Sequence, residues 1–326
     1  MNKAFLLYTA KRLSINVLTL FVALTVTFLL YRLVPGNPLE AYMMSLADLG
    51  QSTPFSQEMI DQYKKDFNLE GSLFSQYISF LRELILHQNL GPSLICFPTP
   101  AQVLIARALP WSISLVGVSI LISWTLGNVM GALAGWLKDR KISQASLVLG
   151  LFFSQIPAYF SAILLVLIFG YTLAVLPTWG AYYYSSTPGL NLEFILDVIT
   201  HAILPSLSLI IVSFFGWMIS MRSMLISILG EDYLLFAEAK GLPKRKIFTR
   251  YVMRNALLPQ VTALGITLGL TVNGSLLVEY IFVYPGIGTL FSQALSYMDY
   301  NTIMGCILIS TFTVLTANLI IEFLYP

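Results

Sequence analysis

The residues with the strongest chemical character lie in one segment, Glu231–Pro259. Its sequence is EDYLLFAEAKGLPKRKIFTRYVMRNALLP, with six basic side chains and three acidic ones. Gly241 and Pro243 break the segment, so we expect a helix over Tyr233–Lys240, a turn, and a second helix over Lys244–Leu258. Such an element either inserts into a groove on a partner subunit or holds its basic residues at anionic lipid headgroups. The residues alone leave both interpretations open.

Residues suited to catalysis or metal binding are sparse. The sequence has two histidines, His87 and His201, and two cysteines, Cys96 and Cys306. It contains no HExxH motif, no nucleophile elbow and no Gly-x-x-x-x-Gly-Lys-[Ser/Thr] loop that could hold nucleotide phosphates. We therefore expect no catalytic residue, no metal site, no cofactor bound by this chain and no nucleic-acid partner. If ATP drives its function, the ATPase must be another chain.

The composition is that of a membrane protein. Hydrophobic residues make up 57% of the chain and charged residues 10%, whereas an average soluble domain has about 25% charged residues. The apolar residues come in blocks of about 20, the length of a helix that crosses a bilayer. We predict an all-α membrane protein with six transmembrane helices, at Leu13–Leu33, Trp111–Trp136, Leu147–Val175, Leu204–Met221, Leu257–Val278 and Ile303–Leu324. The third span contains Pro157 and Gly170, so we expect it to be kinked.

Basic residues indicate which loops face the cytoplasm. They gather at the N-terminus (Lys3, Lys11 and Arg12), after the second span (Lys138, Arg140 and Lys141) and in the segment after the fourth span. The stretches Leu176–Ile203 and Tyr280–Thr302 contain neither Lys nor Arg. Because cytoplasmic loops are enriched in these residues, both termini are expected in the cytoplasm. The first span exceeds the apolar core of a signal peptide and no cleavage site follows it, so we expect it to be retained.

The polarity of the chain divides it into three parts. Residues 1–33 form the N-terminal segment and first transmembrane helix, and residues 109–326 a five-helix core. Between them, residues 34–108 are predicted to form a small extracytoplasmic helical insertion. Thr53-Pro54 begins its first helix, whose apolar face carries Met59, Ile60, Tyr63 and Phe67, and Phe74–Leu86 forms its second. The insertion is either a cap that packs on the other helices or a docking or gating surface.

Small residues recur at helical spacing within two of the spans. Gly127, Gly131 and Gly135 form two overlapping GxxxG units, and Gly265 and Gly269 form another. Such spacing lets helix backbones approach closely in lipid. Close packing is the first interpretation, and a path along which a partner helix moves is the second.

Ionisable residues within the spans form no relay. Arg32 and Glu322 lie near span ends, and Glu279 follows the fifth span. This set does not resemble the proton or ion pathway of a secondary transporter. An outer loop carries an aromatic cluster, Trp179, Tyr182, Tyr183 and Tyr184, which suits an interfacial aromatic belt or stacking on sugar rings.

The segment that opened this section resembles the cytoplasmic EAA loop of ABC-importer permeases. The blocks AKGL at Ala239–Leu242 and RNALLP at Arg254–Pro259 are similar to the dipeptide/oligopeptide subfamily. Further blocks of that subfamily appear in the expected order, at Arg32–Pro38, Leu90–Ser93, Ile156-Pro157 and Val283–Gly288. The resemblance covers essentially the whole chain. Members of the family usually continue beyond Pro326 with a short Asp-Pro-Arg tail, so the resemblance implies a C-terminus that is either truncated or given only in part here.

The resemblance implies a coupling loop at residues 229–257 that contacts an ATPase subunit. Leu235 occupies the position of the family Glu and Phe236 that of an Ala, whereas Ala237 and Gly241 match. No salt bridge from the family Glu is therefore expected. The residues that the resemblance assigns to ATPase coupling are Leu235, Phe236, Ala237, Lys240, Gly241, Pro243, Arg254 and Asn255.

The function implied is that of a permease subunit, half of the translocation pore of an ATP-driven importer in a prokaryotic cell membrane. Its partners would be a second homologous permease subunit, two ATP-binding subunits that hold ATP–Mg, an extracytoplasmic solute-binding protein and membrane lipids. An oligopeptide is the first expectation for the solute and an oligosaccharide the second. The alternatives are a stand-alone secondary transporter or channel for a small polar solute, and a membrane scaffold.

Overall fold

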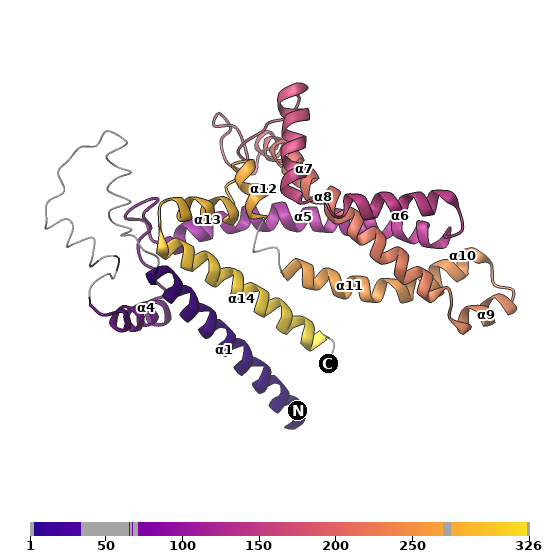
Figure 1. Cartoon of the computed structure of the whole chain (residues 1–326), viewed down its shortest axis with the longest axis horizontal. Helices are drawn as coiled ribbons and strands as arrows, with labels where there is room; N and C mark the ends of the chain where they lie inside the picture. Colours follow the sequence, from indigo (N-terminus) through magenta and orange to yellow (C-terminus); the bar gives the residue numbers. More distant parts are fainter. Residues whose placement is uncertain (1–2, 34–64, 66, 68–70, 270–274, 325–326) are drawn as a thin grey trace. The chain divides into compact units, whose positions relative to one another are not determined.

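The computed structural model describes residues 3–33, 65, 67, 71–269 and 275–324, and these residues are helical wherever they form regular structure (Figure 1). The helices are α1 (Lys3–Leu33), α4 (Leu73–His87), α5 (Ala101–Trp136), α6 (Lys141–Phe153), α7 (Ala158–Leu165), α8 (Leu192–Ile228), α9 (Asp232–Ala239), α10 (Lys244–Lys246), α11 (Met253–Gly269), α12 (Leu276–Ile281), α13 (Ile287–Ser296) and α14 (Tyr300–Leu324). Two π-helical segments, η1 (Val166–Thr172) and η2 (Ile247–Val252), interrupt them.

The chain forms two compact units. Unit 1 contains Met1–Ser112, Val272–Leu276 and Pro285–Pro326, and unit 2 contains Ile113–Thr271 and Leu277–Tyr284. The boundary between the units falls inside α5. The predicted start of the permease core, residue 109, lies in the same helix, which begins at Ala101 and runs through Pro110 without a break.

Unit 1 packs α1 along α14, with α13 against α14. Its apolar core includes Phe28, Phe80, Ile105, Leu290 and Met304. The second predicted helix of the insertion, Phe74–Leu86, is confirmed as α4, which Ser72 caps by accepting a hydrogen bond from the Ser75 amide. Phe80 brings α4 into the core, as a packing cap requires, while the docking role stays a prediction. The first predicted helix of the insertion, which begins at Thr53-Pro54, lies outside the described residues apart from Lys65 and Phe67.

A buried carboxylate fastens the start of α14 in unit 1. Asp299 is fully buried and accepts hydrogen bonds from the Thr302 amide (3.2 Å) and hydroxyl (2.7 Å). It also accepts hydrogen bonds from the Ser93 hydroxyl and from the Leu94 amide (3.0 Å). Asp299 therefore caps α14 and at the same time holds a loop more than 200 residues earlier in the chain.

Unit 2 packs α5, α6, α7 and α11 around the long helix α8. The glycine ridge of α5 faces α8 closely. A Cβ atom added at Gly127 would lie 2.6 Å from the Trp217 Cβ, and one at Gly135 would lie 2.8 Å from the Leu225 Cβ. The packing interpretation of these GxxxG units is confirmed, because no side chain larger than hydrogen fits at this separation.

Within the part of the chain that the structure describes, four helical stretches are long and apolar enough to cross a membrane: Thr9–Leu33, Ala101–Trp136, Leu192–Ile228 and Tyr300–Leu319. They correspond to four of the six predicted spans. The third predicted span falls on α6 and the α7–η1 helix, which bend by 93° at a short break, so the expected kink is found there. The fifth falls on α11, which has 17 residues and ends at residue 269, and its remainder crosses residues 270–274, outside the described residues.

Candidate functional site

Helix α9 lies on the surface of unit 2 and has two distinct faces. Leu234 and Ala237 are buried, with 5% and 4% of their surface exposed. They pack in a cluster with Met221 and Leu225 of α8 and with residues of η2 and α11. Leu235 and Phe236 point away from this cluster and keep 64% and 68% of their surface exposed. Helix α9 therefore presents an exposed Leu–Phe pair on one face while its other face is anchored in unit 2.

A left-handed glycine ends α9. Gly241 has φ +69°, a backbone conformation that residues with a Cβ adopt at a cost. Its amide donates to the Glu238 carbonyl (2.8 Å), and the Leu242 amide donates to the Ala237 carbonyl (3.3 Å). These two bonds form a Schellman motif, which satisfies the last carbonyls of the helix. Pro243 then precedes α10 in an extended conformation, with φ −65° and ψ 141°. The sequence prediction of a helix, a turn and a second helix is confirmed.

Two contacts attach the helical segments on either side of this turn to their neighbours. The Asn255 Nδ2 donates to the Tyr233 hydroxyl (2.9 Å), which joins α11 to α9. The Phe248 ring of η2 packs edge-on against Trp136 at the end of α5, with ring centroids 5.0 Å apart. Helix α9 and the η2 segment are therefore joined by packing and hydrogen bonding to α5, α8 and α11.

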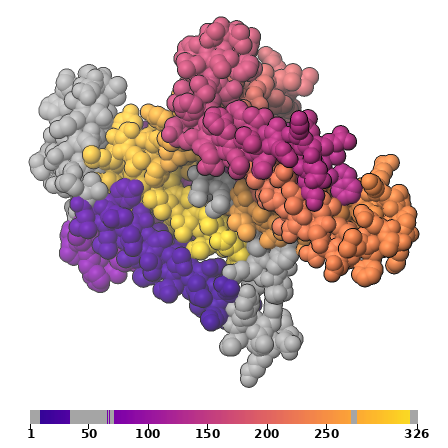
Figure 2. Space-filling view, turned by 45° about the vertical axis from the view of Figure 1, so that its right-hand side comes forward, coloured from indigo at the N-terminus to yellow at the C-terminus, as the bar shows by residue number. Residues whose placement is uncertain are grey.

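The structure brings most of the predicted coupling residues together. Leu235, Phe236, Lys240, Gly241 and Pro243 are exposed on α9 and the following turn, and Arg254 and Asn255 are exposed on α11. The segment that contains them is orange in Figure 2 and lies at the visible surface.

Ala237 differs from the others because it is buried. The sequence interpretation gives it a contact with the ATPase, whereas its position on the inner face of α9 assigns it to packing. Leu234 and Tyr233, which the sequence reasoning did not single out, anchor the helix. The helical spacing of Leu234 and Ala237, three residues apart on one face, could have identified Leu234 as a packing residue from the sequence.

Each histidine lies beside a carboxylate of its own helix. The His87 Nδ1 lies 3.1 Å from a Glu83 oxygen, and the His201 Nδ1 lies 3.0 Å from an Asp197 oxygen. Among the described residues, no group of three or more His, Cys, Asp or Glu side chains is placed to hold a metal ion.

The long apolar helices define a multi-pass membrane protein. Residues 127–326, more than half of the chain, match the model of the family described as the binding-protein-dependent transport system inner membrane component. The chain belongs to this family and is a permease subunit of an ABC transport system. Membership decides against a stand-alone channel or secondary transporter.

Full-length relatives are named as peptide permeases. A protein of Brucella suis biovar 1 that bears the name of a peptide permease protein is 30% identical over 319 residues, which cover 98% of this chain and 96% of that protein. The oligopeptide transport system permease protein AppB of Bacillus subtilis is 28% identical with the same coverage. The dipeptide transport system permease protein DppB of Lactococcus lactis is 27% identical over 301 residues, which cover 91% and 89% of the two chains.

Proposed function

We propose that this chain forms half of the translocation pore of an ATP-driven importer. A second homologous permease subunit completes the pore, two ATP-binding subunits dock on the cytoplasmic side, and an extracytoplasmic solute-binding protein delivers the solute. Membership of the family supports this assembly, because its description makes transport depend on a binding protein. ATP–Mg is bound by the partner subunits.

The proposed topology has six transmembrane helices, with both termini in the cytoplasm of a prokaryotic cell. Lys138, Arg140 and Lys141 are exposed at the junction of α5 and α6, and Lys244, Arg245 and Lys246 are exposed in α10. Clusters of this kind favour the cytoplasmic side of the membrane. Helix α11 is about 25 Å long at 1.5 Å per residue, so it crosses most of a hydrocarbon core that measures about 30 Å. The relatives named above are bacterial.

The single observation that carries the coupling role is the exposed Leu235–Phe236 pair on the anchored helix α9. When the ATP-binding subunits close, they displace α9, and its buried face transmits the displacement to α8 and α11. The bundle then changes between inward-facing and outward-facing states. ATP and solute each favour one state of the same two-state element, which is the requirement for coupling between separate sites. The contact at this end of the loop is apolar, since Leu235 replaces the family Glu.

The proposed solute is an oligopeptide. Its support is that relatives covering nearly the whole chain carry peptide, oligopeptide and dipeptide in their names. An oligosaccharide is the second candidate, and the exposed rings of Trp179 and Tyr184 favour it because sugar rings stack on aromatic side chains. Uptake of a radiolabelled tripeptide and of a radiolabelled trisaccharide by the importer in liposomes distinguishes the two.

The coupling role is tested with Leu235→Ser and Phe236→Ser in the assembled importer. Each removes an exposed apolar side chain from α9 and leaves its anchoring face intact. Loss of two central interface contacts, each contributing more than about 1 kcal/mol, should lower solute-stimulated ATP hydrolysis of the double variant at least about tenfold. Ile142→Ser is the matched control, because Ile142 is an apolar residue of similar exposure (72%) on the same proposed side of the membrane. Normal stimulation in the double variant would refute the role of α9.

A further inference from the structure

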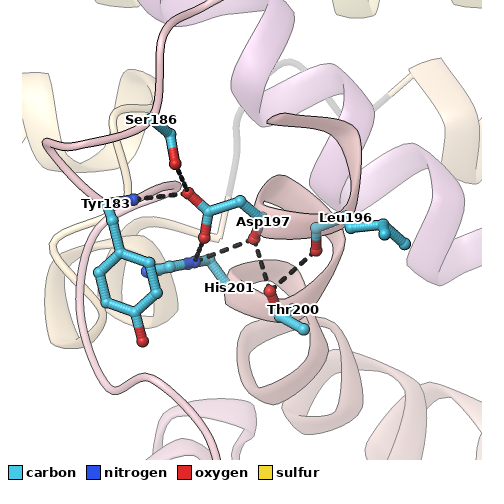
Figure 3. Close-up of polar contacts among 6 residues, drawn as sticks. All are labelled: Tyr183, Ser186, Leu196, Asp197, Thr200 and His201. Carbon is cyan, nitrogen blue, oxygen red and sulfur yellow. Dashed lines mark hydrogen bonds and ion pairs between the residues drawn. The ribbon is translucent and has the colours of Figure 1, made fainter. Parts of the chain in front are cut away.

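A buried carboxylate near the start of α8 holds the aromatic outer loop of unit 2 (Figure 3). Asp197 and His201 are one helical turn apart, and their side chains keep only 9% and 2% of their surface exposed. One Asp197 oxygen lies 3.0 Å from the His201 Nδ1. The other accepts hydrogen bonds from the Ser186 hydroxyl (2.5 Å) and from the Tyr183 amide (2.8 Å). One side chain therefore joins the helix to two positions of the loop.

The loop is ordered further by contacts of its own. The Tyr183 ring packs edge-on against His201, with centroids 4.5 Å apart, and the Tyr182 ring packs against Phe194 at 5.2 Å. The Gly180 amide donates to the Phe282 carbonyl (2.8 Å), which ties the same loop to the end of α12. Next to these contacts the loop exposes Trp179 (55%) and Tyr184 (92%), whose ring centroids are 6.0 Å apart.

The chemistry of the tie differs from that of an interfacial aromatic belt. Belt residues are placed by their preference for the membrane–water boundary and need no buried charge. Burying a carboxylate and an imidazole carries a desolvation cost that their attraction only partly offsets. What this arrangement supplies is a single geometry. His201 holds one carboxylate oxygen from within α8, and the loop brings both the Tyr183 amide and the Ser186 hydroxyl to the other oxygen in only one conformation.

We propose that Asp197 is a positioning residue for solute delivery: it fixes the loop from Trp179 to Ser186 so that Trp179 and Tyr184 form a preset aromatic surface on the outer side of this subunit. The proposal rests on the proposed function, which gives that side the task of receiving solute. Asp197 touches no solute itself. It acts through the loop, and its loss leaves the rings present but no longer held together.

The test uses the complete importer in nanodiscs, with a spin label that reports on the loop directly. Ser185→Cys places the label on an exposed loop residue, and Cys96→Ser removes the exposed native thiol, while Cys306 is buried. Asp197→Asn keeps the shape of the side chain and removes its charge. We expect higher label mobility and a rise of about tenfold in the half-saturating concentration of the solute-loaded binding protein. The ATPase rate without solute and the maximal rate at saturation should stay within about twofold of the parent. The reason is that losing a contact made equally in the ground state and the transition state changes the half-saturating concentration and leaves the maximal rate unchanged.

Thr200→Ala is the matched control. The Thr200 hydroxyl donates to the Leu196 and Asp197 carbonyls of its own helix (both 2.8 Å) and has no hydrogen bond to the loop (Figure 3). This variant should leave label mobility and half-saturation unchanged. Ser186→Ala removes a single bond from the loop side and should give a smaller rise, about threefold. If Asp197→Asn does not assemble into the importer, Ser186→Ala is used in its place.

Two results would overturn the proposal. One is unchanged label mobility in Asp197→Asn and Ser186→Ala, which would show that the carboxylate does not hold the loop. The other is a mobile loop with unchanged half-saturation, which would show that the loop conformation does not matter for delivery. Absence of peptide uptake by the unmodified importer would instead count against the proposed function, while the label would still report on the loop.

Discussion

Replacement of Gly131 by Ala tests whether the glycine ridge of α5 sets its distance from α8. A Cβ atom at Gly131 would meet the Met218 carbonyl oxygen and lie 2.9 Å from the Met221 Cβ. A backbone oxygen cannot rotate away as a side chain can, so the two helices must separate. Gly117 is the matched control, because it lies in the same helix and a Cβ atom there meets nothing within 4 Å.

The magnitude follows from the difference between the two variants. Replacing Gly by Ala within a helix stabilises it by up to about 1 kcal/mol, and this contribution is common to Gly117→Ala and Gly131→Ala. The overpacking cost of about 1–3 kcal/mol applies to Gly131→Ala alone. The free energy of unfolding should therefore be lower for Gly131→Ala than for Gly117→Ala by about 1–3 kcal/mol.

The assay is thermal unfolding of the purified importer in detergent, followed by the loss of the monodisperse peak in size-exclusion chromatography. We expect the apparent melting temperature of Gly131→Ala to fall at least about 2 °C below that of Gly117→Ala. Equal melting temperatures for the two variants would refute the reasoning, since they would mean that α8 yields to a methyl group without cost.

Two further predictions concern a backbone conformation and a buried phenol. Gly241→Ala should cost about 1–2 kcal/mol of local stability because it places a Cβ at φ +69°. Gly241→Asn should cost less because Asn tolerates that conformation. Hydrogen exchange of the Leu242 amide measures both costs, and equal exchange in the Ala variant and the parent would contradict the role of the turn. Burial, assisted by the nearby Glu279, raises the pKa of Tyr284 to about 12. Between pH 10 and 12 the phenol of the unfolded chain has lost its proton while that of the folded chain keeps it. The Tyr284 contribution to stability is therefore full below pH 10 and is lost as the pH rises toward 12. Tyr284→Phe should flatten the fall of melting temperature above pH 10, and an identical slope in the variant and the parent would contradict this role of Tyr284.

The helices themselves were largely predictable from local sequence. The predicted helix Phe74–Leu86 matches α4 to within a residue at each end, and Pro157 predicted the bend within the third predicted span. Gly241 and Pro243 predicted the turn after α9 for a reason that needs no tertiary contact: one favours a positive φ and the other cannot continue a helix. The size of the bend, 93°, was not predictable, because it depends on how α6 and α7 each pack against α8.

The residues that fasten loops to helices were not predictable. Asp299 and Ser93 are 206 positions apart, and Asp197 reaches back 11 positions to Ser186. Nothing in the local pattern distinguishes these carboxylates from ordinary polar residues at helix ends. Only burial on folding makes them bind a loop, because a carboxylate removed from water must find donors nearby.

The sequence by itself determined that this protein crosses a membrane, where most of its long helices lie, where the surface helix α9 ends, and to which family the chain is similar. These properties follow from hydropathy, spacing and backbone preference, which act over a few neighbouring residues. The tertiary structure decided that Leu235 and Phe236 face outward while Ala237 faces inward, and that Asp197 holds the aromatic loop. The physical reason is that exposure and hydrogen-bond partners depend on which elements pack together, and packing joins residues that the sequence keeps apart.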